Sequence, residues 1–486
     1  MRFRSPIAFV ALACLAGCAL RPPATEDVSL RATAPLAITS PSASDSAAGS
    51  WPTDHWWQRY RDPTLDALLE RALAGAPSLN TAAARLASAR QSVRVTGAGL
   101  GVQVAAQGSF TRQRLSDNGL LPPEFLGFNW YDQSDLGLTV NYTFDWWGRQ
   151  RSLIEASLDD ARAAQAERAA AQLGLAAAVA QTYFGWQADA ARLQLARERL
   201  ALLEKRAVIE TRRTEAELDS GDAVQVAAHD VAASREGVAL LEGSQRLRVV
   251  TLAALLGVAV EALPPLEARA LPSSAGALPA NLTIDLIARR PEVQASRWRV
   301  EAARQQLSAV GAEYYPDVSL RALVGLSSID IGKLLQTNSA APAFTAAVHL
   351  PLFDSGLRGA RFGARQAQVV AAVADYDEAI VEAARDVGQA ATRLTQASAQ
   401  REQRLAQQSA AQTLVKSASA RVRAGTTDLR PQLQAELSLL QERDAVAQLE
   451  FAMIDADISL QQALGGGYDA SVTDQNSARV TGKLNP

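Results

Sequence analysis

Alternation of apolar and polar side chains distinguishes one stretch of the chain. Between Ser134 and Trp147 the side chains alternate cleanly, and a period of two is typical of a strand whose two faces meet different surroundings. One face consists of Leu136, Leu138, Val140, Tyr142, Phe144 and Trp146. A transmembrane barrel places aromatic residues at strand ends, where lipid meets water. The pattern therefore predicts a strand that crosses an outer membrane.

Three weaker alternations predict three further strands. Their apolar faces are Val102, Val104, Ala106, Gly108 and Phe110; Val318, Leu320, Ala322, Val324 and Leu326; and Phe344, Ala346, Val348, Leu350 and Leu352. Arg321 and His349 then fall on polar faces, which makes both candidates for positions that face a lumen. The strands are expected to pair as two hairpins, at about residues 100–147 and 315–353.

Four strands are too few to close a membrane barrel. The smallest such barrels have about eight strands, and an open sheet edge in lipid leaves backbone groups unpaired at several kcal/mol each. If these strands lie in a membrane, the chain must complete its barrel with copies of itself.

Long helices are predicted for most of the remaining chain. No proline occurs between Gly148 and Gly221, or between Leu357 and Ala424, and helix-favouring residues predominate in both stretches. The first stretch alone extends to roughly 100 Å as a helix. Apolar residues three or four apart, such as Val381, Ala384, Val387, Ala391 and Leu394, indicate coiled-coil packing. The helices by themselves are equally compatible with a long soluble bundle that has no channel.

The chain also repeats four landmarks in the same order, at offsets between 204 and 214 residues. They are Pro77 and Pro291, Phe144-Asp145 and Phe353-Asp354, the helix-stopping Gly221 and Gly425, and Leu256-Gly257 and Leu464-Gly465. So long a period is that of a half-molecule and not of a short solenoid repeat. We therefore predict a tandem duplication, with one repeat at residues 51–270, the second at 271–467 and a polar tail at 468–486.

The N-terminus has the layout of a bacterial lipoprotein signal. Two arginines precede an apolar stretch that is too short to span a bilayer, and the segment ends in Leu15-Ala16-Gly17-Cys18. This ending resembles a lipobox, which implies removal of residues 1–17 and lipid attachment to Cys18. Residues 18–50 then form a flexible tether. No aspartate follows the cysteine, so the resemblance implies the outer membrane of a Gram-negative cell.

Composition argues against catalysis. The chain has two cysteines, Cys14 and Cys18, both in the leader region, so a cysteine nucleophile, a thiolate metal site and a disulfide scaffold are excluded. Three histidines leave few general bases or metal ligands, and the formal net charge of −3 does not predict nucleic-acid binding. We expect no enzyme activity and no cofactor other than the lipid on Cys18.

Four motifs together resemble one family, the TolC-like outer-membrane factors, and in particular the NodT or OprM group of efflux lipoproteins. The resemblance runs through nearly the whole mature chain. Its motifs are Trp56-Trp57-Gln58-Arg59-Tyr60-Arg61-Asp62-Pro63-Thr64-Leu65-Asp66, Tyr142-Thr143-Phe144-Asp145-Trp146-Trp147-Gly148-Arg149, Ala288-Arg289-Arg290-Pro291-Glu292-Val293 and Tyr315-Pro316-Asp317-Val318-Ser319-Leu320.

The resemblance implies an α+β membrane protein. Three chains would each give four β-strands to one 12-stranded outer-membrane β-barrel, continued by a long periplasmic α-helical barrel. The expected function is a trimeric duct that passively conducts drugs or toxic small molecules. Its expected partners are a periplasmic adaptor protein and an inner-membrane pump of the resistance-nodulation-division or major facilitator type.

The turn after the second long helix is the candidate periplasmic gate. The family places charged rings there, and this chain has Asp428, Arg430 and Gln434, with Gln434 where many relatives have an aspartate. Rings of like charge bind counter-ions in a narrow pore. The alternative is a helix cap with a solvated surface charge.

Two other functions fit parts of the pattern. The same duct can serve peptide, protein or oligosaccharide secretion. A lipid-anchored periplasmic coiled-coil scaffold is the other alternative, although it has no need for the apolar face from Leu136 to Trp146.

Overall fold

The computed structural model describes residues 52–118, 123–272 and 289–468. The predicted signal segment at 1–17, Cys18 and the tether at 18–50 lie outside these ranges, as does the tail beyond Tyr468. The described residues form two compact units. A sheet unit contains residues 86–163 and 296–376, and a helical unit contains the described parts of 31–85, 164–295 and 377–486.

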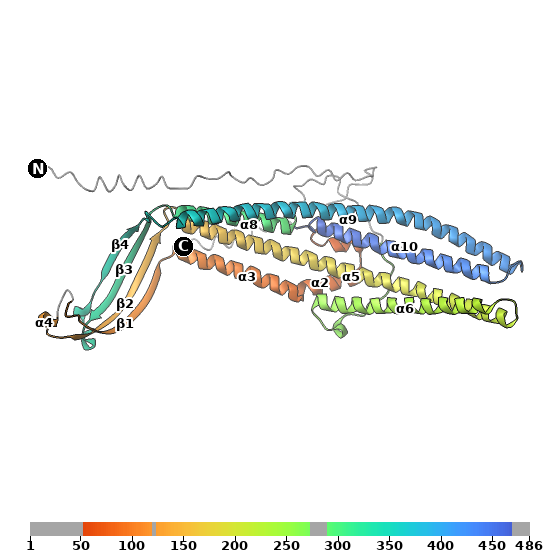
Figure 1. The fold of residues 1–486 in the computed structure, drawn as a ribbon, viewed down its shortest axis with the longest axis horizontal. Helices are drawn as coiled ribbons and strands as arrows, with labels where there is room; N and C mark the ends of the chain where they lie inside the picture. Colours follow the sequence, from red (N-terminus) through yellow and green to blue (C-terminus); the bar gives the residue numbers. More distant parts are fainter. Residues whose placement is uncertain (1–51, 119–122, 273–288, 469–486) are drawn as a thin grey trace. The chain divides into compact units, whose positions relative to one another are not determined.

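The sheet unit contains four antiparallel strands in the order β1-β2-β3-β4 (Figure 1). The strands are β1 (Gln103–Arg114), β2 (Trp130–Phe144), β3 (Asp317–Ser328) and β4 (Ala343–His349). The two predicted hairpins are confirmed as β1-β2 and β3-β4. β2 also pairs with β3, so the hairpins form one sheet, and within the single chain β1 and β4 are its open edges.

The register confirms the predicted faces. Val104 lies opposite Val140, Val140 opposite Ala322, and Ala322 opposite Phe344, so the apolar positions of all four strands share one face. This face is exposed in the single chain: Leu138 is 50%, Val324 64% and Phe344 70% exposed. An apolar surface of this extent needs a cover such as lipid.

The last strand is shorter than its sequence pattern predicts. Leu350 and Leu352 continue the alternation, but β4 ends at His349. The physical reason is Pro351, which has no backbone N–H to donate to a strand ladder.

The long helices α5 (Arg149–Glu215) and α9 (Leu357–Arg423) begin with the same cap. The Asp145 carboxylate accepts hydrogen bonds from the backbone N–H of Gln150 (2.9 Å) and Arg151 (3.0 Å). Asp354 accepts from Gly356 (3.1 Å) and Arg358 (3.3 Å) in the same way. Each aspartate satisfies amides that the first turn of a helix leaves unpaired. The two Phe-Asp landmarks therefore serve one structural purpose in both halves.

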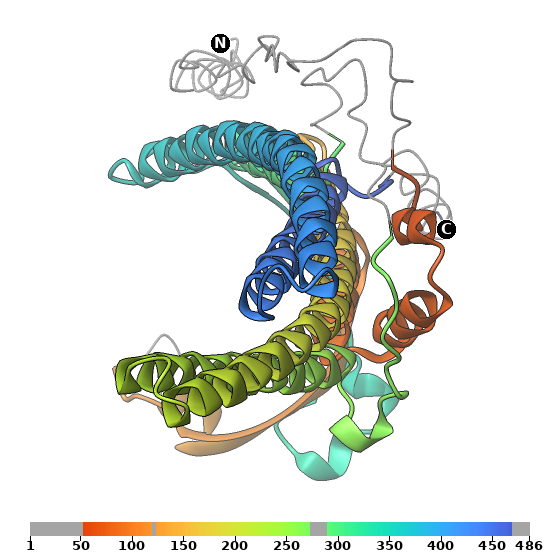
Figure 2. The same cartoon turned by 90° about the vertical axis from the view of Figure 1, so that its right-hand side faces the viewer.

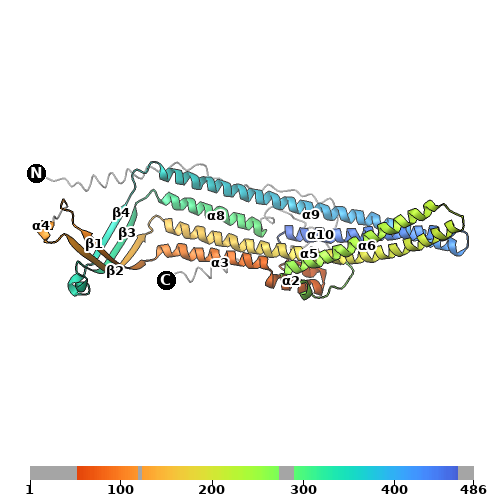
Figure 3. The same ribbon diagram turned by 60° about the horizontal axis from the view of Figure 1, so that its bottom comes forward.

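In the helical unit, α5 and α9 each pair with the helix that follows in the chain. Figure 3 shows α5 beside α6 (Gly221–Leu256) and α9 beside α10 (Arg430–Ala463), and the end-on view of Figure 2 agrees. Ion pairs join the helices, for example Arg197 with Glu242 (2.7 Å) and Arg404 with Glu442 (2.9 Å). The predicted α9 seam is buried from Ala384 onward, whereas Val381 is exposed.

The core of the helical unit forms around the Trp-Trp motif. The short helix η2 (Trp56–Tyr60) and α2 (Pro63–Gly75) pack on α5, α6 and α10, with Tyr183 and Phe184 fully buried. The Tyr60 hydroxyl donates to the fully buried Asp457 carboxylate at 2.7 Å. The remaining elements are α3 (Pro77–Gly97), η3 (Ala98–Leu100), α4 (Pro123–Leu126), η4 (Val260–Ala262), α8 (Pro291–Ala312), η5 (Ile331–Lys333) and η6 (Thr337–Ser339).

For one of the four repeated landmarks, Gly221, the predicted role is wrong. Gly221 does not stop a helix, since it is the first residue of α6. Two residues after the end of α5, Glu217 adopts the left-handed conformation (φ 55°), and Gly425 does the same two residues after the end of α9 (φ 68°). Leu218 and Thr426 both return a backbone hydrogen bond to the carbonyl five residues earlier, at Arg213 and Arg421. Glu217 is therefore the structural counterpart of Gly425.

Candidate functional site

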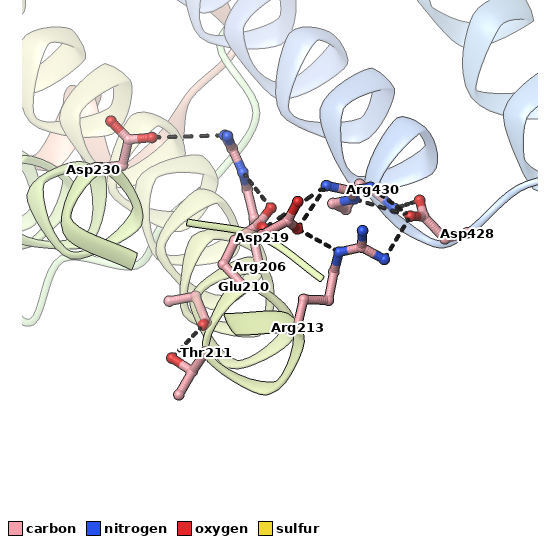
Figure 4. A network of polar contacts seen from close by, with 9 residues as sticks. Arg206, Glu210, Thr211, Arg213, Asp219, Asp230, Asp428 and Arg430 are labelled. Carbon is pink, nitrogen blue, oxygen red and sulfur yellow. Dashed lines mark hydrogen bonds and ion pairs between the residues drawn. The ribbon is translucent and has the colours of Figure 1, made fainter. Parts of the chain in front are cut away.

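A network of charged side chains joins the two helix turns of the helical unit (Figure 4). Arg430, at the start of α10, binds Asp428 of its own turn (2.9 Å) and Asp219 of the α5-α6 turn (3.3 Å). Arg213, at the end of α5, binds the same two carboxylates, at 2.5 Å from Asp219 and 3.7 Å from Asp428. Two arginines and two aspartates thus alternate across the two turns.

The network extends along α5 toward α6. Glu210, which is buried, lies 3.9 Å from Arg430 and 3.9 Å from Arg206. Arg206 in turn lies 3.6 Å from Asp230 of α6. Charges of opposite sign therefore follow one another from α6 through both turns to α10.

Electrostatics keep these groups ionised. The hydrogen bond from Arg213 lowers the pKa of Asp219, and the hydrogen bond from Arg430 lowers the pKa of Asp428. The bond to Asp428 also raises the pKa of Arg430. At neutral pH all three groups carry their charges.

Of the three predicted gate residues, the structure brings together Asp428 and Arg430 but not Gln434. Besides its ion pair, Asp428 accepts the Arg430 backbone N–H (3.1 Å) as a cap. The structure therefore shows the cap, and the role of the pair in a gate stays a prediction. The Gln434 side chain is exposed and makes no hydrogen bond to the network among the described residues. Pro431 lies in the first turn of α10, where proline is favoured.

Sequence reasoning missed the partners from the first half, Arg213 and Asp219. Nothing near them in the chain indicates that their turn meets another turn some two hundred residues away. The duplication was the available signal, since it places the α5-α6 turn opposite the turn that holds Asp428.

The polar face of the sheet is the second candidate site. Arg321 donates from Nε to Asn141 Oδ1 at 3.0 Å, and the register places Thr345 beside it. His349, the last residue of β4, pairs in register with Asp317, the first residue of β3. Both residues lie on the face opposite Val104 and Phe344, as the alternation predicts.

Other kinds of site receive no support within the described residues. They contain no group of three or more His, Cys, Asp or Glu side chains placed to hold a metal ion. None of the helices in those ranges combines the length and the apolar composition needed to cross a membrane.

Comparison with known proteins gives one consistent result. The model of the family described as "Outer membrane efflux protein" matches residues 68–258 and 282–466, which supports the predicted two repeats. The chain is 31% identical to the multidrug resistance outer membrane protein MdtP of Shigella flexneri over 438 residues, which is 87% of this chain and 88% of MdtP. It is 31% identical to MdtQ of Escherichia coli O157:H7, over 95% of this chain and 97% of MdtQ.

A solved structure agrees with these relatives. The outer membrane protein VceC of Vibrio cholerae superposes with a TM-score of 0.77 and 29% identity, over 86% of this chain and all of VceC. The TolC-like fold that the motifs predict is thereby confirmed. The chain belongs to the outer membrane efflux protein family and is an efflux channel of the Gram-negative outer membrane, not an enzyme.

Proposed function

We propose that this protein is the duct of a tripartite efflux system that exports drugs or toxic small molecules. Channels of the TolC family form trimers, and three copies of the four-stranded sheet supply the strands of one closed barrel. The observation that carries the proposal is the sheet itself, which has an exposed apolar face and two open edges. Lipid covers the apolar face, and the edges β1 and β4 pair with neighbouring copies. The relatives MdtP and MdtQ are multidrug resistance outer membrane proteins, which supports this cargo.

The charged network at the turns serves as a latch that holds the periplasmic end narrow. In the latch, Arg430 ties the second turn to Asp219 of the first (Figure 4). The Asp428 and Arg430 side chains are 40% and 36% exposed, and ion pairs at such sites contribute about 0.2–1 kcal/mol each. Because each ion pair is weak, the docking of a partner breaks the latch without unfolding the helices. The partners are a periplasmic adaptor and an inner-membrane pump.

A conductance experiment in planar bilayers tests the latch. Asp428→Asn and Arg430→Gln each remove a charge from the network, and we expect the single-channel conductance to rise several-fold. Gln434→Ala is the matched control, because Gln434 is on the same helix but outside the network. Equal conductance in all four proteins would show that the network does not restrict the pore.

Lipid attachment at Cys18 belongs to the same proposal. The sequence Leu15-Ala16-Gly17-Cys18 supports it. Mass spectrometry of the mature N-terminus should find an acylated Cys18 in the wild type, and Cys18→Ser should lose the acyl mass. An unmodified cysteine on the mature chain would rule out the anchor.

A further inference from the structure

Arg321 differs from the other charged residues of the sheet. Among the four strands it is the one arginine or lysine on the polar face, since Arg112 and Arg114 lie on the opposite face. Its neighbours in register are Asn141 on β2 and Thr345 on β4, and Asn141 itself lies opposite Gln103. The layer around Arg321 is therefore polar and otherwise uncharged.

The Arg321 charge is also uncompensated. Arg112 lies 3.7 Å from Asp132, and Arg114 lies 3.4 Å from Asp117, whereas no acidic group of the described chain lies within 4.0 Å of Arg321. One of its five N–H donors binds Asn141 Oδ1, and the side chain is exposed. The four donors on its terminal nitrogens therefore remain for an oxyanion.

Two acidic groups share the polar face, and both are too distant to cancel this charge. Asp317 lies four residues before Arg321 on β3, which is about 13 Å along the strand. Asp135 lies further away. It lies on the same face of β2, six residues beyond Asn141, which is about 20 Å along the strand. The Debye length at physiological salt is about 8 Å, so charges at these separations are largely screened from each other. Asp135 is in addition hydrogen-bonded to Gln133 (3.0 Å) and Ser109 (3.3 Å).

We propose that three Arg321 side chains, one from each protomer, form an anion-binding layer inside the barrel. This inference rests on the proposed function, because it requires the polar face of the sheet to line a pore of three copies. Threefold symmetry then places three guanidinium groups at the same height in the pore. The paired N–H donors of each planar guanidinium match the two oxygens of a phosphate or carboxylate. The ligand class is a multivalent oxyanion, and the strand part of the pore favours anions over cations at this level.

Calorimetry of the detergent-purified trimer with inorganic tripolyphosphate at low salt measures the binding directly. We expect one tripolyphosphate per three chains, and Arg321→Gln should weaken binding by about tenfold or more, since charge-assisted bonds are lost. Arg112→Gln is the matched control, because it removes an arginine from the opposite face of the same sheet. Equal binding by wild type and Arg321→Gln, or equal loss in Arg112→Gln, would overturn the proposal.

Ion selectivity in planar bilayers supplies a second readout. Arg321→Gln should lower the chloride-to-potassium permeability ratio, and Asp135→Asn should raise it. An unchanged ratio in Arg321→Gln would contradict the anion layer, even if the pore conducts normally. An Asp428→Asn trimer, in which the latch is weakened, that binds tripolyphosphate but carries no current would contradict the duct and leave the binding layer standing, so the two failures are distinguishable.

Discussion

Glu217 and Gly425 occupy equivalent positions after the two long helices, but the left-handed backbone has a different cost for each. Their φ angles are 55° and 68°. A residue with a Cβ is less stable in this region by roughly 1–2 kcal/mol, whereas glycine adopts it freely. We expect Gly425→Ala to lower the free energy of unfolding by about 1 kcal/mol, and Glu217→Gly to raise it by a few tenths. Thermal unfolding followed by circular dichroism measures both.

Gly221 provides the control for this pair. It begins α6, its φ is not positive, and no heavy atom lies within 4 Å of where a Cβ would stand. Gly221→Ala should therefore stabilise the protein, because alanine favours helix over glycine by up to about 1 kcal/mol. A loss of stability in Gly221→Ala as large as that in Gly425→Ala would show that the left-handed turn is not the cause.

These two glycines also show what sequence alone misses at the scale of a residue. Gly221 has the residue type that is typical of a helix stop, whereas Glu217, which lies nearer to the end of α5, has a residue type that gives no signal of a left-handed turn. Glycine is frequent at such positions but is not required there. The sequence pattern placed the turn to within a few residues of its position. It assigned the left-handed backbone to Gly221, whereas the structure has it at Glu217.

At the scale of an element, the segment η2 is held by a buried polar contact. The Tyr60 hydroxyl donates to Asp457, which is fully buried, while Arg59 (3.5 Å) and Gln461 (3.4 Å) approach its other oxygen. Burial and the Asp457 charge raise the pKa of Tyr60, so the hydroxyl stays a donor at neutral pH. Removing it leaves a buried carboxylate oxygen without its closest partner.

We therefore expect Tyr60→Phe to lower the free energy of unfolding by about 1–3 kcal/mol. Limited proteolysis should cut residues 52–62 faster in this variant than in the wild type. Tyr142→Phe is a suitable control, since that hydroxyl makes no hydrogen bond within the described chain. If Tyr60→Phe and Tyr142→Phe behave alike, the contact does not anchor η2.

Elements were more predictable than their contacts because their signals are local. The period of two identified the strands and their faces, and the absence of proline identified α5 and α9. The end of β4 also has a local cause, Pro351, which the alternation of apolar residues concealed. The pairing of β2 with β3, by contrast, joins residues nearly two hundred apart, and no local pattern encodes it.

At the scale of the whole molecule, the latch predicts how the channel responds to acid. Arg213 and Arg430 lower the pKa values of Asp219 and Asp428, so the folded protein keeps both carboxylates ionised below the ordinary aspartate value of 3.8. A lowered pKa stabilises the folded network at every pH above that value, and the contribution is lost only as the pH falls further. The arginines stay charged throughout, and Arg430 has a raised pKa.

We therefore expect the conductance of the wild-type channel to stay constant between about pH 7 and pH 5, and to rise only at pH values below 3.8 as the two aspartates take up protons. Asp428→Asn mimics one protonated aspartate, so its conductance should be high already at neutral pH and should change less on acidification. Gln434→Ala should follow the wild type at every pH, because the residue lies outside the network. A wild-type conductance that rises between pH 7 and pH 5 would mean that a group with a higher pKa controls the opening, and the aspartates at the turns would then not form the latch.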